Sequence, residues 1–237
     1  VLLMKRIAFS LVFLFSLALT AADEPGGFFP KGTYKYSVSM EKENSFESLG
    51  TAVFTMKEED GMFVSDSVIK FSINGVEMNM NQTITEKKDF SPVKSVSETI
   101  VQKGDFSTKS VIEISFNGKE IRMIDDGEEK LITPSKKFYF GSDILTHQMI
   151  KSKFQKGAKH TVVVLDPSLD SEGFANMTIE SLGKEKVSYK GTDILLNKLV
   201  MKFKDFNETV IYCDDAGINY IIKYEIMNIK VKMVLDK

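Results

Sequence analysis

The residue types that most often carry catalysis are scarce in this sequence. Cys213 is its single cysteine, and a thiolate nucleophile needs a nearby base or positive charge, whereas Asp214 and Asp215 follow it directly. His147 and His160 are the only histidines, and neither has a second potential ligand at helical or hairpin spacing, so a histidine-based zinc site is not expected. The sequence therefore predicts no catalytic residue and no enzyme activity.

Acidic side chains offer a second kind of chemistry, the binding of a calcium ion. Asp166, Asp170 and Glu172 fall within one short segment, and calcium is bound by several oxygen ligands. The segment lacks the alternating acidic order of a calcium-binding loop, so a solvated acidic loop is the simpler interpretation. The sequence also contains no nucleophile elbow, phosphate-binding loop or dinucleotide-binding fingerprint. We therefore expect no metal ion and no cofactor.

Apolar side chains that alternate along predicted strands are the remaining candidates, and they point to binding instead of catalysis. Met and Phe gather on one face of several strands, so the concave side of a curved sheet would hold an acyl chain or another apolar ligand. The residues predicted to line this ligand site are Met78, Met80, Ile84, Leu199, Met201, Phe203 and Tyr220. The alternative is a solid core without a ligand, in which these residues pack against Leu145, Met149 and Phe154 and the protein is a structural or protein-interaction module.

A helix is expected to lie against or inside these strands. The segment 141–157 is the one stretch after residue 30 whose apolar residues recur at helical spacing. Ser142 is a suitable N-cap, Asp143 lies in the first turn where the helix dipole favours a negative charge, and Gly157 ends the pattern. The apolar face consists of Ile144, Leu145, Met149, Ile150 and Phe154.

Most of the chain after residue 31 has the pattern of antiparallel strands joined by tight turns. Apolar and polar residues alternate along the strands, and 174–182 and 185–189 are expected as two separate strands. Asn74-Gly75 and Asn117-Gly118 predict two-residue hairpin turns, because a type I′ turn needs positive φ at both central residues, and Asp126-Gly127 predicts a further tight turn. The predicted fold is mainly β, a curved antiparallel sheet or half-barrel of meandering hairpins packed around one α-helix.

The first residues have the three parts of a secretory signal. Lys5 and Arg6 precede an apolar run over 7–19, and small residues at 20–22 supply a cleavage site. The apolar run is shorter than the roughly 20 residues that a membrane-spanning helix needs. The expected organisation is a signal peptide at 1–22, a flexible lead-in at 23–31 and a single β domain at 32–237. Cleavage would leave the protein in the periplasm or secreted.

The charge distribution limits the class of partner. The chain has 31 Lys and Arg against 33 Asp and Glu, and the basic residues are dispersed along the strands. Nucleic-acid binding requires a concentrated basic face, so a nucleic-acid partner is not expected. The remaining partner classes are a lipid or other apolar small molecule and a protein of the cell envelope.

Short motifs in the second half of the chain carry a resemblance to a known group of proteins. They are the helix ending at Gly157, the strand closing on Leu165-Asp166-Pro167, the segment 179–187 and the turn Asp214-Asp215-Ala216-Gly217. With these motifs, residues 139–226 resemble the C-terminal part of bacterial exported β proteins, most of them uncharacterised, which occur alone or beside transglutaminase-like domains. Their curved sheet around a helix resembles the half-barrels of periplasmic lipoprotein carriers. The resemblance implies an apolar cavity and lipid handling.

Secretion from a bacterial host tests the predicted signal peptide. Cleavage after Ala22 should leave Asp23 as the first residue of the secreted protein, because a small residue precedes the cut in such signals. Intact-mass measurement identifies that first residue. A secreted form that retains residues 7–19 would contradict the prediction.

Overall fold

The structure is a computed structural model that describes residues 31–42, 45–165, 173–203, 208–226 and 228–236. The expected signal peptide and the calcium-loop candidates Asp166, Asp170 and Glu172 lie outside the described residues. The elements are β1 (Gly32–Lys42), β2 (Ser45–Glu59), β3 (Met62–Ile73), β4 (Val76–Lys87), β5 (Pro92–Lys103), β6 (Phe106–Phe116), β7 (Ile121–Asp125), β8 (Glu128–Ile132), α2 (Asp143–Lys151), β9 (Lys159–Leu165), β10 (Phe174–Tyr189), β11 (Thr192–Phe203), β12 (Thr209–Cys213), β13 (Asn219–Ile226) and β14 (Ile229–Asp236). No helix in this part of the chain is long and apolar enough to cross a membrane.

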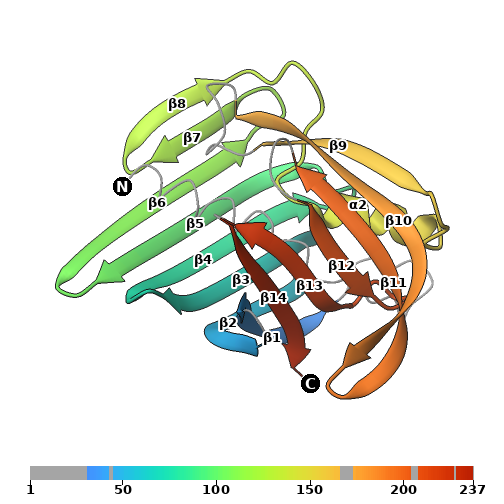
Figure 1. Ribbon diagram of the computed structural model, residues 1–237. Coiled ribbons are helices and arrows are strands. Elements are labelled where there is room, and N and C mark those ends of the chain that lie inside the picture. The colour runs from blue at the N-terminus through green and yellow to red at the C-terminus, as the bar shows by residue number, and fades with distance from the viewer. Residues whose placement is uncertain (1–30, 43–44, 166–172, 204–207, 227, 237) are drawn as a thin grey trace.

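The strands form one curved antiparallel sheet, which confirms the predicted fold class. Its 14 strands follow the order β8-β7-β6-β5-β4-β3-β2-β1-β14-β13-β12-β11-β10-β9. All but one of these pairings join strands that follow each other in the chain, as expected for a meander of hairpins. The exception is β1 with β14, which joins the two ends of the sheet-forming chain (Figure 1).

The edge strands β8 and β9 do not pair with each other, and the connection between them lies along β9. Both backbone groups of Tyr139 form hydrogen bonds with β9. Its N–H donates to the Val163 carbonyl at 3.0 Å, and its carbonyl accepts from the Leu165 N–H at 3.0 Å. Phe138 and Phe140, on either side, join a buried apolar cluster with Ile121 of β7. This segment therefore fills the space between the two ends of the sheet, which lie near one another in Figure 1.

The main core lies on the concave face, the side of the sheet on which α2 packs. The alternation of each strand places one set of side chains there, as in β14, where Val231, Met233 and Leu235 are buried and Lys230 is exposed. Core residues at most 1% exposed include Tyr36 of β1, Ile69 of β3, Met80 of β4, Leu145 and Met149 of α2, Met201 of β11 and Met233 of β14. The helix is thus part of the core, as the apolar face of segment 141–157 predicted.

The helix is shorter than predicted and ends before Gly157. α2 stops at Lys151, and Lys153 and Phe154 both have φ of 50°, a left-handed conformation that ends an α-helix. Phe154 N–H still donates to the Met149 carbonyl at 3.0 Å, so its side chain returns to the core. Ser142 precedes the first helical residue, but its side chain makes no capping hydrogen bond.

The segment 174–189 forms one strand, not the two that the sequence predicted. β10 runs unbroken from Phe174 to Tyr189, so the predicted strands 174–182 and 185–189 are one strand with a bulge between Ser181 and Gly183. At the bulge, Ser181 Oγ donates to the Phe154 carbonyl at 2.8 Å, and its own carbonyl accepts from Gly157 N–H at 2.7 Å. The bulge therefore turns Ser181 toward the end of the helical segment.

Two of the three predicted hairpin turns are confirmed. Asn74 and Gly75 have φ of 51° and 74°, and Asp126 and Gly127 have φ of 50° and 93°, as two-residue turns with positive φ require. The two-residue turn at Asn117-Gly118 is wrong, because β6 and β7 are joined by the loop 117–120. There Asn117 Oδ1 accepts hydrogen bonds from the backbone N–H groups of residues 119 and 120, at 2.9 and 2.8 Å.

Truncation of the helix side chains tests its place in the core. Leu145→Ala and Met149→Ala should each lower the free energy of unfolding by about 2–5 kcal/mol, because both side chains are 0% exposed and their loss leaves a cavity. Lys151→Ala, on the exposed side of α2, should change it by less than about 0.5 kcal/mol. Urea unfolding measures all three, and equal, negligible losses would show that α2 is not part of the core.

Candidate functional site

The predicted ligand-site residues come from three strands and lie in the interior. On β4, Met78, Met80 and Ile84 are 5%, 1% and 2% exposed. On β11, Leu199, Met201 and Phe203 are 1%, 1% and 2% exposed, and Tyr220 of β13 is partly buried. The structure brings Met78, Met80, Leu199, Met201 and Phe203 into the main core, which Tyr220 contacts, and places Ile84 in the cluster with Phe138. Their role in ligand binding stays a prediction.

Solvent reaches this apolar lining at the end of β3 and β4 that is remote from α2. Asp143 of α2 contacts Ser65 near the start of β3, and Ile73 lies about 26 Å further along the extended strand. Phe71, Ile73 and Val76 there are partly buried and pack against the main core. We call these three residues the apolar rim.

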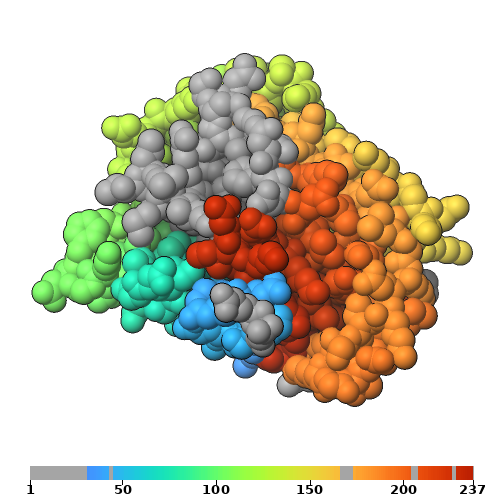
Figure 2. Space-filling model, in the orientation of Figure 1, coloured from blue at the N-terminus to red at the C-terminus, as the bar shows by residue number. Residues whose placement is uncertain are grey.

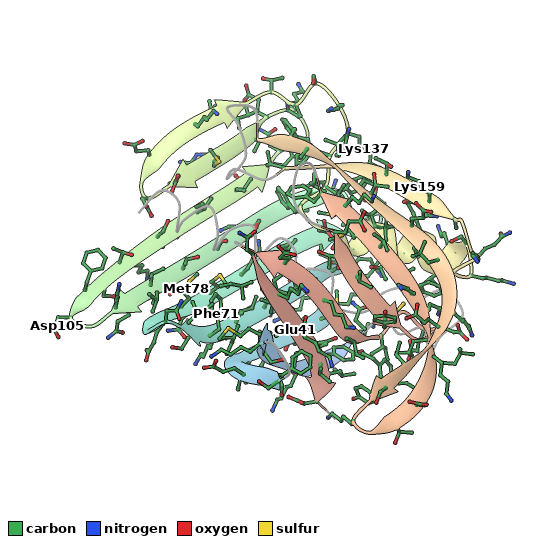
Figure 3. The ribbon with its side chains drawn as sticks, viewed as in Figure 1. Glu41, Phe71, Met78, Asp105, Lys137 and Lys159 are labelled. Carbon is green, nitrogen blue, oxygen red and sulfur yellow. The ribbon has the colours of Figure 1, made fainter. Side chains whose placement is uncertain are left out.

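Cross-strand pairs join the apolar rim to the predicted ligand residues. Phe71 lies opposite Met78, and Met78 lies opposite Val101 of β5, so the three share one face of the sheet. Phe71 and Met78 are labelled in Figure 3. Met78 is among the residues predicted from the sequence and Phe71 is not, although Phe71 follows Ile69 at the spacing of one strand face.

A band of buried polar side chains crosses the same interior nearer to the helix. Ser67, Gln82 and Ser97 occupy facing positions on β3, β4 and β5 and are 8%, 4% and 3% exposed. Gln82 Nε2 donates to Ser95 Oγ at 3.5 Å, whereas Ser97 Oγ has no hydrogen-bond partner among the described residues. A cavity of about 10 Å³ beside Ser67 and Gln82 has room for roughly one water molecule, which is the usual partner of such groups.

Two carboxylic acids are buried where α2 meets the sheet. Glu86 of β4 and Asp143 of α2 are each 3% exposed. The Phe140 N–H donates to the Glu86 carboxyl group, and Ser65 Oγ donates to Asp143 Oδ2 at 3.4 Å. Burial raises the pKa of Glu86 well above its usual range, and the nearby charges of Asp143 and Asp89 raise it further. Burial also raises the pKa of Asp143 to about 7, so the pair keeps at least one proton at neutral pH.

The surroundings of this acid pair provide little positive charge. His147, one turn beyond Asp143 on α2, lies with its ring centroid 5.2 Å from that of Phe90. Burial, together with the charge of Lys151, lowers the pKa of His147 and favours its neutral form. Asp143 is expected from the sequence in the first turn of the helix, but its burial in the interior is not. Glu86 could have been found, because it continues the buried face of β4 two residues after Ile84.

The other candidates for chemistry are dispersed. Cys213 is 0% exposed, and burial together with Asp214 and Asp215 raises the pKa of its thiol. His147 and His160 come from α2 and β9 and are both partly buried. Among the described residues, no group of three or more His, Cys, Asp or Glu side chains is arranged to hold a metal ion.

Comparisons with known proteins identify structures of similar fold but no function. No protein-family model matches the chain, and no curated protein matches it either. The structure is similar to a β-barrel-like protein of the domain of unknown function DUF1849 from Brucella abortus, with a TM-score of 0.61, 10% identity, and coverage of 86% of this chain and 95% of that chain. This likeness shows a shared fold alone.

Two further solved structures have lower scores. A DUF1089 family protein from Pseudomonas aeruginosa has a TM-score of 0.40 at 12% identity, and the match covers 73% of this chain and 89% of that protein's chain. The hypothetical lipoprotein YmcC from Escherichia coli has a TM-score of 0.35 at 13% identity and covers 96% of each chain. The neighbours are thus uncharacterised, as the resemblance implied, and the relation to lipoprotein carriers stays a prediction.

The acid pair predicts a pH-dependent stability. Because the pKa of Asp143 is higher in the folded protein, the folded state holds a proton that the unfolded chain releases, and this contribution is lost as pH rises through about 7. Asp143 alone should therefore lower the free energy of unfolding by on the order of 3 kcal/mol between about pH 5 and pH 8, and Glu86, whose pKa is also raised, should add to this fall. Urea unfolding across this range measures the change.

Matched variants separate the acid pair from other titrating groups. Asp143→Asn and Glu86→Gln should each remove part of the pH dependence, because neither amide can ionise. Glu120→Gln, in the exposed loop between β6 and β7, should leave it unchanged. If the free energy of unfolding of Asp143→Asn fell with pH as much as that of the unmodified protein, Asp143 would not be a source of the pH dependence.

Proposed function

We propose that the protein is an exported protein of the cell envelope that binds an apolar chain, such as the acyl chain of a lipid, on the concave face of its sheet. The observation that carries the proposal is the apolar rim of Phe71, Ile73 and Val76, whose side chains are only partly buried and adjoin the Met-rich core. Exposed apolar surface of this kind has a free-energy cost in water, which a bound chain would remove.

The ends of the interior differ in what they offer a ligand. At one end, α2 and the acid pair pack against β3 and β4, and the side chains there are buried. At the other end, Met78 follows the apolar rim inward, and Met80 follows Met78. Methionine side chains are flexible, so Met78 is suited to reshape itself around an entering chain. A ligand would enter at the apolar rim, and the most buried predicted residues would form the inner end of its site.

The energetics are sufficient for useful affinity. Each methylene group transferred from water contributes about 0.8 kcal/mol, so burial of about twelve methylene groups of a long acyl chain would contribute about 10 kcal/mol. Binding must offset lost translational and side-chain freedom, which takes at least about 4 kcal/mol. A long acyl chain can therefore bind, whereas a short one cannot.

A specific observation favours the alternative, a structural or protein-interaction module with a solid core. Leu199, Met201 and Phe203 of β11 are at most 2% exposed, as in an interior packed without a ligand. Lining residues of this kind would have to move before a chain reached them. The two functions therefore differ in whether the apolar rim accepts a ligand.

Titration with hexadecanoate and with a phospholipid tests the proposal. We expect saturable binding, and native mass spectrometry of gently extracted protein should show co-purifying lipid. Phe71→Ser should weaken binding by about tenfold, because it replaces an apolar wall of the site with a hydroxyl group. The control is Val68→Ser on the same strand, since Val68 is 37% exposed and points to the opposite face.

The result is interpreted on variants that still unfold cooperatively. Loss of binding in Phe71→Ser together with retention in Val68→Ser supports the concave site. No saturable binding below roughly millimolar ligand, where binding is worth only about 4 kcal/mol, would favour the interaction module instead.

A further inference from the structure

A groove on the surface lies over β13 and β14 where they are joined by their hairpin, and residues of β1, β2 and β12 also line it. Its volume is about 460 Å³, which is within the usual range of small-molecule sites. Lys223, Lys230 and Lys232 line it, together with Phe46, which is 55% exposed. Figure 2 shows β14 in red directly beside the blue strands β1 and β2, and Glu41, labelled in Figure 3, also lines the groove.

Two of these lysines form an unusual pair. Lys223 of β13 and Lys232 of β14 occupy directly opposite positions in the antiparallel register. Opposite residues share one face of the sheet with Cβ atoms about 5 Å apart, and like charges in such a pair destabilise it. The adjacent residues Tyr224 and Val231 point to the core, so the two ammonium groups lie on the outer face.

Neither lysine of this pair has a carboxylate within salt-bridge distance in the part of the chain that the structure describes. Other lysines on the same face do. Lys198 of β11 pairs with Glu185 at 2.8 Å, and Lys202 pairs with Glu208 at 2.5 Å. The positive charge of Lys223 and Lys232 is therefore not neutralised by an ion pair of this kind.

One aromatic ring lies near each lysine of the pair, and acidic charges act from beyond ion-pair distance, Glu41 on Lys232 and Glu185 on Lys223. Lys232 Nζ lies 4.7 Å from the ring centroid of Phe46, and Lys223 Nζ lies 5.6 Å from that of Tyr212. Burial lowers the pKa of Lys232, the charge of Lys223 lowers it further, and Glu41 acts in the opposite direction. The ammonium group of Lys232 is thus partly removed from water with incomplete compensation.

The acidic residues of the groove leave room for an anion. Glu208 is already paired with Lys202, and Glu225 lies opposite Lys230 in the register of β13 and β14. Glu41 and Glu225 are therefore the acidic side chains of the groove lining that face its three lysines, Lys223, Lys230 and Lys232. The three ammonium groups outnumber these two carboxylates, and a ligand with two negative charges can accept hydrogen bonds from both Lys223 and Lys232.

We propose that Lys223 and Lys232 form a binding site for a small phosphate monoester whose organic group rests against Phe46. A phosphate monoester carries a charge of about −1.5 to −2 at neutral pH, and its oxygens can accept hydrogen bonds from both ammonium groups. The groove is larger than a free phosphate ion requires, and the exposed Phe46 ring offers an apolar wall for an attached group. This site is independent of the ligand on the concave face.

Calorimetric titration with phenyl phosphate and with inorganic phosphate tests the proposal. Phenyl phosphate should bind saturably, more tightly than inorganic phosphate, and more weakly as salt is added. Lys223→Gln and Lys232→Gln should each raise its Kd by about tenfold or more, because each removes a hydrogen bond from a charged donor. Phe46→Ala should weaken phenyl phosphate but not inorganic phosphate.

Controls make each outcome decisive. Lys109→Gln on β6, a lysine already paired with Glu98 at 2.5 Å, should bind phenyl phosphate as the unmodified protein does. In the absence of ligand, Lys223→Gln should unfold at the same or a higher temperature, because it relieves like-charge repulsion. The proposal is overturned if phenyl phosphate does not bind saturably by about 10 mM, a Kd worth less than 3 kcal/mol. Equal loss in all three lysine variants, or attachment to anionic lipid vesicles without phenyl phosphate binding, would also overturn it.

Discussion

The pairing of β1 with β14 is the constraint on which the single sheet depends. It joins two meanders, β1 to β8 and β9 to β14, each of which would otherwise have a further unpaired edge. The core reinforces the junction, because the Tyr36 hydroxyl of β1 donates to the Asn219 carbonyl of β13 at 2.8 Å. With the meanders joined, their concave faces turn toward each other and share one interior, and both proposed binding sites follow from this geometry.

The gap between the edge strands β8 and β9 determines where the carboxyl groups of Asp143 and Glu86 are buried. Since β8 and β9 do not pair, the connection through Tyr139 takes the position beside β9, and α2 follows it into the interior. This path places Asp143 against β3 and near Glu86 of β4, far from solvent. Neutral carboxyl groups tolerate such a position, whereas a pair of ionised ones would repel each other in a poorly solvated site. The interior therefore holds a pair of buried carboxyl groups beside the apolar side chains of α2 and is apolar toward the rim.

Local sequence patterns predicted the strand faces and most of the tight turns, because these depend on residues close together in the chain. Alternation defines a strand face over a few residues, and positive φ at Asn74-Gly75 is a property of one turn, so the hairpin meander was predictable. Asn117-Gly118 has the same residue types, but the Asn117 side chain stabilises a longer loop. The helix end and the bulge at Ser181 depend on each other across 27 residues, which a local pattern does not contain. Likewise, Met80 and Met201 could be placed on a buried face, but not divided between ligand lining and packed core.

The β1–β14 junction also has a consequence for the order in which the chain folds. The hydrogen bond from Ser39 to the Lys232 carbonyl spans 193 residues, a length that a ribosome takes on the order of 10–40 s to synthesise. β2 can pair with β1 early, and β3 with β2, but the other edge of β1 stays unpaired until the last strand, β14, is made. During that interval the nascent chain presents an extended strand edge that other chains can pair with. A holding chaperone, or slow release of the first meander, would protect the molecule at this stage.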